Sequence, residues 1–288
     1  MPASLLSGLS IDALVIRMVA TAFVVIAVTW SVGAFGPRIG GALAGLPIVL
    51  GPGFYFLGAQ ASAPFIAQAA TYALLSLCAT QLFLLAYLAA ARRARPLAAL
   101  AGALTVWLLS AAMLRLLPAE VWLAATLFAL ATWACWSIGA RFLSPVPTAK
   151  GKVGGTGLLL LRGLLAGVLV AAVTTLNQRL GSAGSGLLLA FPIGYTVIAV
   201  TIHQRIGSAS VIATLRSALL GTVSLAGFCA TLALAITLGP WQAALGIALA
   251  ASVAITLWLV QAAARKSRAS PAGDAFEVKK RDTHAGIP

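Results

Sequence analysis

Polar side chains that could bind a small solute occur mainly in the second half of the 288-residue chain. Hydroxyl, amide and basic groups stand there close together, and no carboxylate accompanies them. They are Thr174, Asn177, Tyr195, Thr196, His203, Arg205 and Arg216, to which the first half adds Gln60. Donors without acids favour a small polar or anionic solute. Helix-to-helix hydrogen bonds by the threonines and snorkelling of the arginines are the structural alternatives.

Two prolines, Pro47 and Pro192, complete this predicted substrate-binding set. Each lies within an apolar stretch, in G-L-P-I-V-L-G-P-G and in A-F-P-I-G. Proline removes a backbone donor and interrupts a helix. Backbone groups freed at membrane depth must face protein or a water-filled cavity. One such proline is commonly a simple kink, whereas a matched pair in related positions favours two functional breaks.

Enzyme chemistry is not expected from this sequence. Asp12 and Glu120 are the acidic residues that precede the C-terminal tail, and both lie near the ends of predicted spans. A buried carboxylate relay for protons or sodium is therefore excluded. Cys78, Cys135 and Cys229 lie in apolar runs without paired spacing, so neither a disulfide nor a metal site is predicted. We expect no catalytic residue, no metal and no cofactor.

The composition predicts an integral membrane protein. Hydrophobic residues make up 61% of the chain and charged residues 8%, whereas soluble domains are about 45–50% apolar and about 25% charged. A soluble surface cannot be built from so few charges, so the lipid bilayer is the first expected partner. The net charge of +14 is assigned to loops and a basic tail, and nucleic acid is not an expected partner.

Apolar runs of about 20 residues, broken by glycine, proline or charge, predict nine transmembrane helices. The predicted spans are about 13–33, 40–58, 64–91, 97–115, 121–143, 157–177, 186–203, 210–238 and 241–263. A cytoplasmic linker is predicted at 144–156. The polar, basic residues 264–288 are predicted to form a disordered cytoplasmic tail.

The basic residues separate by side when these spans alternate across the membrane. One side carries Arg38, Arg92, Arg93, Arg95, Arg141, Lys150, Lys152, Arg162, Arg205 and Arg216, together with the tail. The other side carries Arg17, Arg115 and Arg179. Cytoplasmic loops are enriched in Lys and Arg. The bias predicts a bacterial inner-membrane protein with its N-terminus outside and its C-terminus in the cytoplasm.

The two halves of the chain align without gaps at an offset of 145 residues. The aligned pairs include Arg17 with Arg162, Gly36 with Gly181, Gly41 with Gly186, and Pro47 with Pro192. The offset contains an odd number of predicted spans, so equivalent helices run in opposite directions. The predicted fold is an all-α membrane protein with two inverted four-helix repeats. Residues 1–143 contain the first repeat plus a linking helix, and 157–263 form the second.

Inverted repeats with interrupted helices are typical of secondary transporters. We therefore predict alternating access for a small polar or anionic solute at the repeat interface. The alternatives are a non-transport accessory or scaffold subunit of an envelope-synthesis system, and a lipid flippase. The solute, the direction of transport, the coupling ion and a homo-oligomeric state stay open at this point.

Two segments resemble a known group of small membrane proteins. The stretch Gly186–Ala199, the H-Q-R group after it and the segment ending at Arg216 resemble the GlpM-like family, and Gly40–Pro47 is similar to its DUF3147 relatives. The resemblance implies that each repeat corresponds to one such short chain, and it implies a loose link to envelope or polysaccharide physiology. The first half departs from the pattern, because Gln60 aligns with Arg205.

Overall fold

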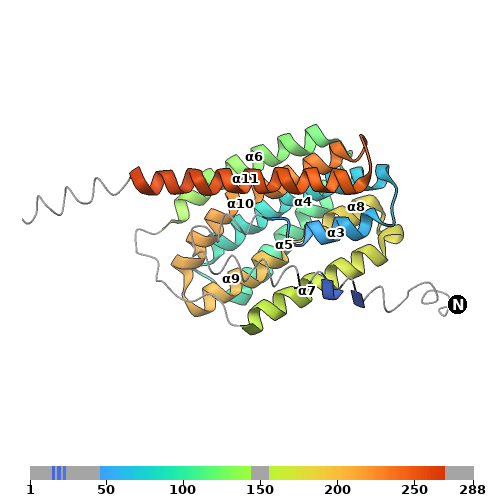
Figure 1. The fold of residues 1–288 in the computed structure, drawn as a ribbon. Helices are drawn as coiled ribbons and strands as arrows, with labels where there is room; N and C mark the ends of the chain where they lie inside the picture. The colour runs from blue at the N-terminus through green and yellow to red at the C-terminus, as the bar shows by residue number, and fades with distance from the viewer. Residues whose placement is uncertain (1–14, 17, 21, 24–45, 144–155, 270–288) are drawn as a thin grey trace, which may run out of the picture.

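The computed structural model describes residues 46–143 and 156–269, together with 15, 16, 18–20, 22 and 23. Every regular element in these ranges is helical (Figure 1). The helices are α3 (Leu50–Gly58), α4 (Ala63–Ala90), α5 (Pro96–Leu114), α6 (Val121–Gly139), α7 (Thr156–Thr175), α8 (Asn177–Leu189), α9 (Ile193–Arg205), α10 (Ser208–Ala235) and α11 (Trp241–Ala269). A short 3-10 helix, Ala140–Phe142, extends α6. The predicted all-α class is confirmed for this part of the chain.

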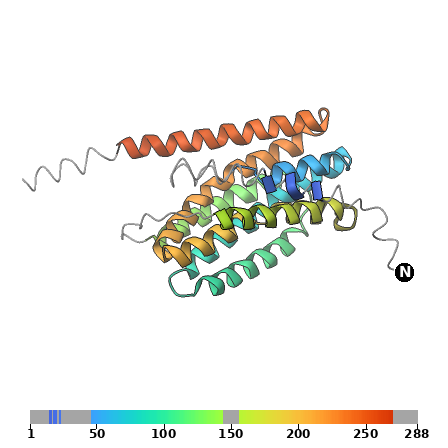
Figure 2. The same ribbon diagram turned by 60° about the horizontal axis from the view of Figure 1, so that its bottom comes forward.

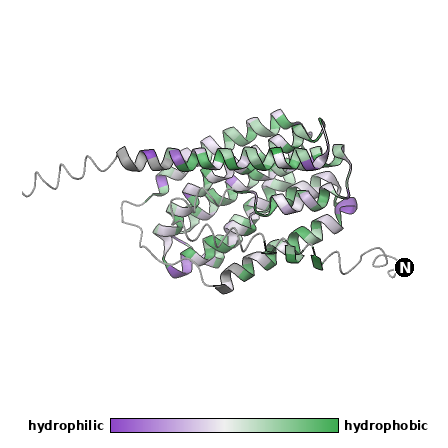
Figure 3. Ribbon diagram, viewed as in Figure 1, coloured by the Kyte–Doolittle hydropathy of each residue, from purple (hydrophilic) through white to green (hydrophobic). Residues whose placement is uncertain are grey.

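Among the described residues, six helical segments are long and apolar enough to cross a membrane. Four are the single helices α4, α5, α10 and α11, the fifth is α6 with its 3-10 turn, and the sixth is α8 together with α9. Apolar residues cover the lengths of these helices, and hydrophilic residues gather near their ends (Figure 3). The protein is therefore a polytopic membrane protein.

The other three predicted spans do not appear among these six segments. The span at 13–33 lies largely outside the described residues, and the described part of 40–58 begins at Leu46. The span at 157–177 corresponds to α7, which runs over Thr156–Thr175 and contains the apolar stretch Gly163–Thr175. The total of nine spans stays a prediction.

Two boundaries differ from those expected. The span predicted at 186–203 is preceded by a further helical stretch that begins at Asn177, and the two stretches meet at Gly181, whose φ of 65° and ψ of 178° are not helical. Glycine adopts this conformation without steric cost, so α8 is interrupted at Gly181. At the other end, α11 continues to Ala269. Residues 264–269, which were expected in the tail, are helical.

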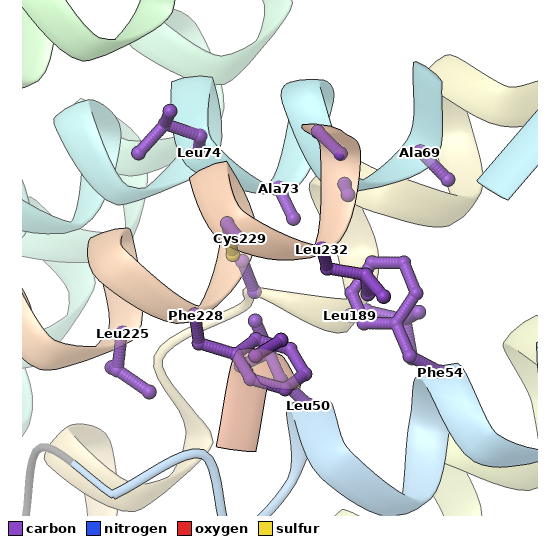
Figure 4. Close-up of a cluster of buried hydrophobic side chains, with 14 of the residues drawn as sticks. Leu50, Phe54, Ala69, Ala73, Leu74, Leu189, Leu225, Phe228, Cys229 and Leu232 are labelled. Carbon is purple, nitrogen blue, oxygen red and sulfur yellow. The ribbon is translucent and has the colours of Figure 1, made fainter. Parts of the chain in front are cut away.

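Two antiparallel helices, α4 and α10, form the centre of the bundle. Leu74 in the first half of α4 shares a buried cluster with Phe228 and Leu232 in the second half of α10 (Figure 4). Leu88, near the end of α4, shares a second cluster with Leu219, near the start of α10. α5 packs against α4 and α11 packs against α10, at opposite edges of the bundle (Figure 2).

Helix boundaries in the two halves repeat at the offset found in the sequence. α4 and α10 each contain 28 residues, and they begin at Ala63 and Ser208. α5 and α11 begin at Pro96 and Trp241, which are separated by the same 145 positions. Equivalent backbone hydrogen bonds occur in the turns that follow α4 and α10. They are donated by residues 91, 93 and 99 in the first turn and by residues 236, 238 and 244 in the second.

Candidate functional site

The sixth membrane-crossing segment is broken at Pro192, between α8 and α9. Ile193 N donates to Phe191 O at 2.8 Å, and Pro192 has φ −77° and ψ 48°. These values describe an inverse γ-turn centred on the proline. Thr196 N then donates to Pro192 O at 2.9 Å and begins the regular part of α9. The interruption expected from the sequence is present.

Two hydroxyl groups of α4 bind the carbonyl groups beside this break. Ser76 Oγ donates to Leu187 O at 2.9 Å, and Thr80 Oγ1 donates to Ala190 O at 3.4 Å. Both side chains are buried, and their spacing of four residues places them on one face of α4. Sequence reasoning missed them. The available signal was the S-x-x-x-T spacing in an otherwise apolar span.

These hydroxyls reach the break because α4 and α8 touch at their backbones. Gly186 lies so close to Ala69 that a Cβ atom would collide with the Ala69 carbonyl group, and the Tyr72 Cβ would be 2.9 Å away. One turn earlier, Ser182 Oγ donates to Gln68 Oε1 at 2.9 Å. The contacts advance together along both helices, so α4 and α8 run parallel. Small residues permit this close approach.

Buried polar atoms without hydrogen-bond partners occur on the helices around the break. The Trp107 ring of α5 packs edge-on against Phe191, with the ring centroids 4.8 Å apart. Its Nε1 is buried and has no partner among the described residues, and the same holds for Gln81 Oε1 of α4 and Ser185 Oγ of α8. An unsatisfied buried polar atom costs about 1–3 kcal/mol. These atoms are unused hydrogen-bonding capacity beside the break.

Gln81 also connects the three central helices. Its Nε2 lies 2.7 Å from Thr132 Oγ1 of α6, 2.9 Å from Thr222 Oγ1 and 3.1 Å from Leu219 O of α10. Gln81 and Thr222 are buried completely. Amide-to-hydroxyl bonds of this kind hold helices together where water is absent. The cluster fixes α4 against α6 and α10 next to the break.

Pro47 lies in a second turn with the same backbone pattern, directly before α3, and we call this turn the Pro47 break. Ile48 N donates to Leu46 O at 2.7 Å, and Gly51 N donates to Pro47 O at 2.7 Å. Each of these bonds has its counterpart 145 positions later, at the Pro192 break. Both prolines are buried. The match extends from the sequence to the main-chain hydrogen bonds.

The helix after Pro47, α3, touches the helix before Pro192, α8. Gly53 in the first turn of α3 faces the side chain of Leu189 at the end of α8, and a Cβ at Gly53 would lie 2.6 Å from the Leu189 Cδ2. Leu189 and Phe54 belong to one buried cluster, in which α3, α4, α8 and α10 meet (Figure 4). The segment after the first break therefore packs on the segment before the second.

The predicted site residues do not gather at one place. Thr174 and Asn177 are buried where α7 turns into α8, and Thr174 Oγ1 donates to Val170 O at 2.7 Å. Tyr195 is buried in the first turn of α9, and Thr196 Oγ1 donates to Ile193 O at 2.7 Å beside it. Of this predicted set, the break brings together Pro192, Tyr195 and Thr196.

The predicted residues at the two ends of the bundle are separate from the break. His203 is half-buried, and its Nδ1 lies 3.3 Å from the Tyr87 hydroxyl of α4. Arg205 is exposed at the end of α9. His203 lies in the last turn of α9, at the end of the helix away from the Pro192 break. Gln60 is exposed after α3 and donates to Phe56 O at 2.6 Å.

Arg216 is in contact with a helix other than the one that carries His203 and Arg205. It was grouped with His203 and Arg205 at one mouth of the protein. In the structure, its guanidinium carbon lies 3.8 Å from the ring centroid of Trp136 on α6. No hydrogen bond joins Arg216 to His203 or Arg205 in the described part of the chain. The basic residues of α9 and the arginine of α10 therefore face different neighbours.

Metal ligands also fail to gather. Within the described residues, no three His, Cys, Asp or Glu side chains come close enough to hold an ion. Cys78, Cys135 and Cys229 are buried and unpaired. Comparisons of the chain with protein families, with curated proteins and with solved structures find no match, so the GlpM-like resemblance stays a prediction.

Proposed function

We propose that this protein is a secondary transporter for a small polar or anionic solute, and that the solute path passes the proline breaks. The observation that carries the proposal is the repeated break: two γ-turns, at Pro47 and Pro192, with the same backbone hydrogen bonds at an offset of 145 residues. Interrupted helices in related halves are typical of secondary transporters, whose substrate sites lie where the halves meet.

The architecture that we propose with this function has nine spans in two inverted four-helix repeats. The shared boundaries of α4 with α10 and of α5 with α11 support the repeat. The antiparallel packing of α4 on α10 supports its inversion. α6 packs against both central helices, as a linking helix would. We place the N-terminus outside and the C-terminus in the cytoplasm of a bacterial inner membrane, because of the distribution of basic residues.

The polar groups at the second break suit the proposed solute. Trp107 offers a buried N–H donor, which an anionic or carbonyl oxygen accepts. The carbonyl groups of Leu187 and Ala190 are held by the hydroxyls of Ser76 and Thr80. A hydroxyl both donates and accepts, so either group can turn from the main chain to a bound solute. The site then needs no carboxylate.

Uptake by proteoliposomes tests the proposal. The reconstituted protein is assayed with radiolabelled acetate, inorganic phosphate, glucose and glycine, in the wild-type form and with Pro47→Ala or Pro192→Ala. We expect uptake of at least one probe, and a loss of about tenfold or more in its initial rate in both variants. Pro118→Ala, in the exposed turn after α5, is the matched control and should transport like the wild type.

Other outcomes separate the rival functions. Uptake at the wild-type rate in both proline variants would show that the breaks are not needed for transport. No uptake of any probe, together with co-purification of a protein partner, would favour the accessory-subunit role. Movement of fluorescent phospholipids between the leaflets, without solute uptake, would favour a flippase.

A further inference from the structure

Arg216 carries a charge that the described part of the protein does not neutralise. It lies eight residues into α10, about 12 Å from the start of that membrane helix. Its Nε is buried and makes no hydrogen bond to any of the described residues. Within the described ranges Glu120 is the single acidic residue. It lies at the N-cap of α6, at the end of that helix away from Trp136. Sixteen residues separate Glu120 from Trp136, or about 24 Å of helix.

The stacking of Arg216 on Trp136 leaves hydrogen-bond donors free. The ring covers one face of the guanidinium group at 3.8 Å, which stabilises the cation without using an N–H. The planar group still presents its in-plane N–H fork, and this fork matches two oxygens of a phosphate or carboxylate. An unpaired charge within a membrane segment is costly. The geometry therefore calls for an anionic group beside Arg216.

The position of the pair at the edge of the bundle indicates where such an anion comes from. Trp136 belongs to α6, on which Trp133 and Ile138 are 70% and 40% exposed, and Trp136 and Arg216 are themselves partly exposed. The proline breaks, in contrast, lie among α4, α5 and α8. Arg92 Nη2 donates to Phe142 O at 3.0 Å and brings a second basic residue to the same end of α6. Anionic lipid headgroups are attracted to basic residues at such positions.

We propose that Arg216 and Trp136 form a binding site for the phosphate group of an anionic phospholipid, between α6 and α10. The lipid phosphate accepts hydrogen bonds from the guanidinium fork, and its acyl chains follow the exposed apolar face of α6. This site is separate from the solute path and does not depend on the proposed transport function.

Lipid titration of the delipidated protein, followed by native mass spectrometry, tests this site. Phosphatidylglycerol and phosphatidylcholine are the two probes. We expect phosphatidylglycerol to bind more tightly, and Arg216→Gln to weaken its binding about tenfold. Arg216→Lys keeps the charge but loses the planar fork, so it should bind phosphatidylglycerol less tightly than the wild type and more tightly than Arg216→Gln. Arg205→Gln, which removes an exposed arginine from the end of α9, is the control and should bind like the wild type.

Three results would overturn the proposal. One is equal binding of phosphatidylglycerol by the wild type and by the Gln variant. Another is an equal loss in Arg205→Gln, which would show a general effect of net charge. A third is full displacement of the lipid by inorganic phosphate at equal concentration, which would keep the phosphate chemistry and reject the lipid as its source. If Arg216→Gln does not fold, Arg216→Lys and Trp136→Leu provide the same comparison.

Discussion

The two proline breaks share a backbone geometry and differ in the side chains around them. At Pro192, an indole from α5 and two hydroxyls from α4 surround the turn. At the positions aligned with these around Pro47, Ser252 stands in place of Trp107, Gly221 in place of Ser76 and Leu225 in place of Thr80. Ser252 Oγ is buried without a partner among the described residues. The same turn therefore has two different polar surroundings.

The comparison shows that the backbone turn and the polar groups around it depend on different residues. The γ-turn needs a proline, which fixes φ and lacks an N–H, and both halves supply one. The donors around the turn come from neighbouring helices, and these helices have diverged between the halves. We infer that a solute is recognised mainly at the Pro192 break. On this inference, the Pro47 break contributes a turn of the main chain and few contacts to the solute.

The largest effect is expected where the second break depends on contact between backbones. Gly186→Val would drive a side chain into the Ala69 carbonyl group and force α8 away from α4. Overpacking typically costs about 1–3 kcal/mol, and a collision with main chain lies at or above the upper end of that range. Thermal unfolding in detergent and the yield after size-exclusion chromatography measure the loss.

Gly102→Val is the control for this change. A Cβ at Gly102 meets nothing within 4 Å, so the variant should unfold at nearly the wild-type temperature. A wild-type melting temperature for Gly186→Val would show that α4 and α8 separate without cost, and the comparison of the breaks would lose its structural basis.

A smaller effect is expected from removing the hydroxyls that distinguish the two breaks. Ser76→Ala combined with Thr80→Val leaves two carbonyl groups without their donors, at a cost of about 1–3 kcal/mol in the free energy of unfolding. Denaturant unfolding checks this value. Ser217→Ala, which removes an exposed hydroxyl bonded within its own helix, should change it by less than about 0.5 kcal/mol. Equal effects would mean that the hydroxyls do not hold the break.

The smallest change in stability is expected for Trp107→Phe. The ring contact with Phe191 is retained, and the lost N–H has no partner in the described structure. We expect a change within about 0.5 kcal/mol in unfolding, together with weaker binding of whichever probe the wild type transports. Ser252→Ala at the equivalent position should leave that binding unchanged. Weaker binding in Ser252→Ala alone would reverse our assignment of the binding break.

Much of the helical framework could be predicted from the sequence, because residues that end or begin helices mark most of its boundaries. Starts at 64, 97, 121 and 241 were expected, and the helices begin at Ala63, Pro96, Val121 and Trp241. Prolines and short polar turns mark these boundaries, and apolar length marks the spans. The stretch around Gly181 was expected to be a loop, and the structure has there two short helical stretches that meet at a single non-helical residue.

The surroundings of the break could not be predicted in the same way. Ser76, Thr80 and Gln81 lie in an apolar helix, and a single polar residue there indicates only some contact with another helix. Which helix it meets depends on packing over more than a hundred residues of sequence, as in the bond from Ser76 to Leu187. The contact of Arg216 with Trp136 could not be predicted for the same reason, since the sequence does not fix which helix a side chain meets.

Gln81 joins more helices than the hydroxyls beside the break do. One amide links α4 to α6 and to α10 in the buried centre of the bundle, whereas Ser76 and Thr80 link α4 to α8 alone. Shifting α10 along α4 would break the bonds from Gln81 to Thr222 and Leu219, and shifting α6 would break the bond to Thr132. α4, α6 and α10 therefore form one group joined by the Gln81 amide, and the hydroxyls attach α8 to that group through α4.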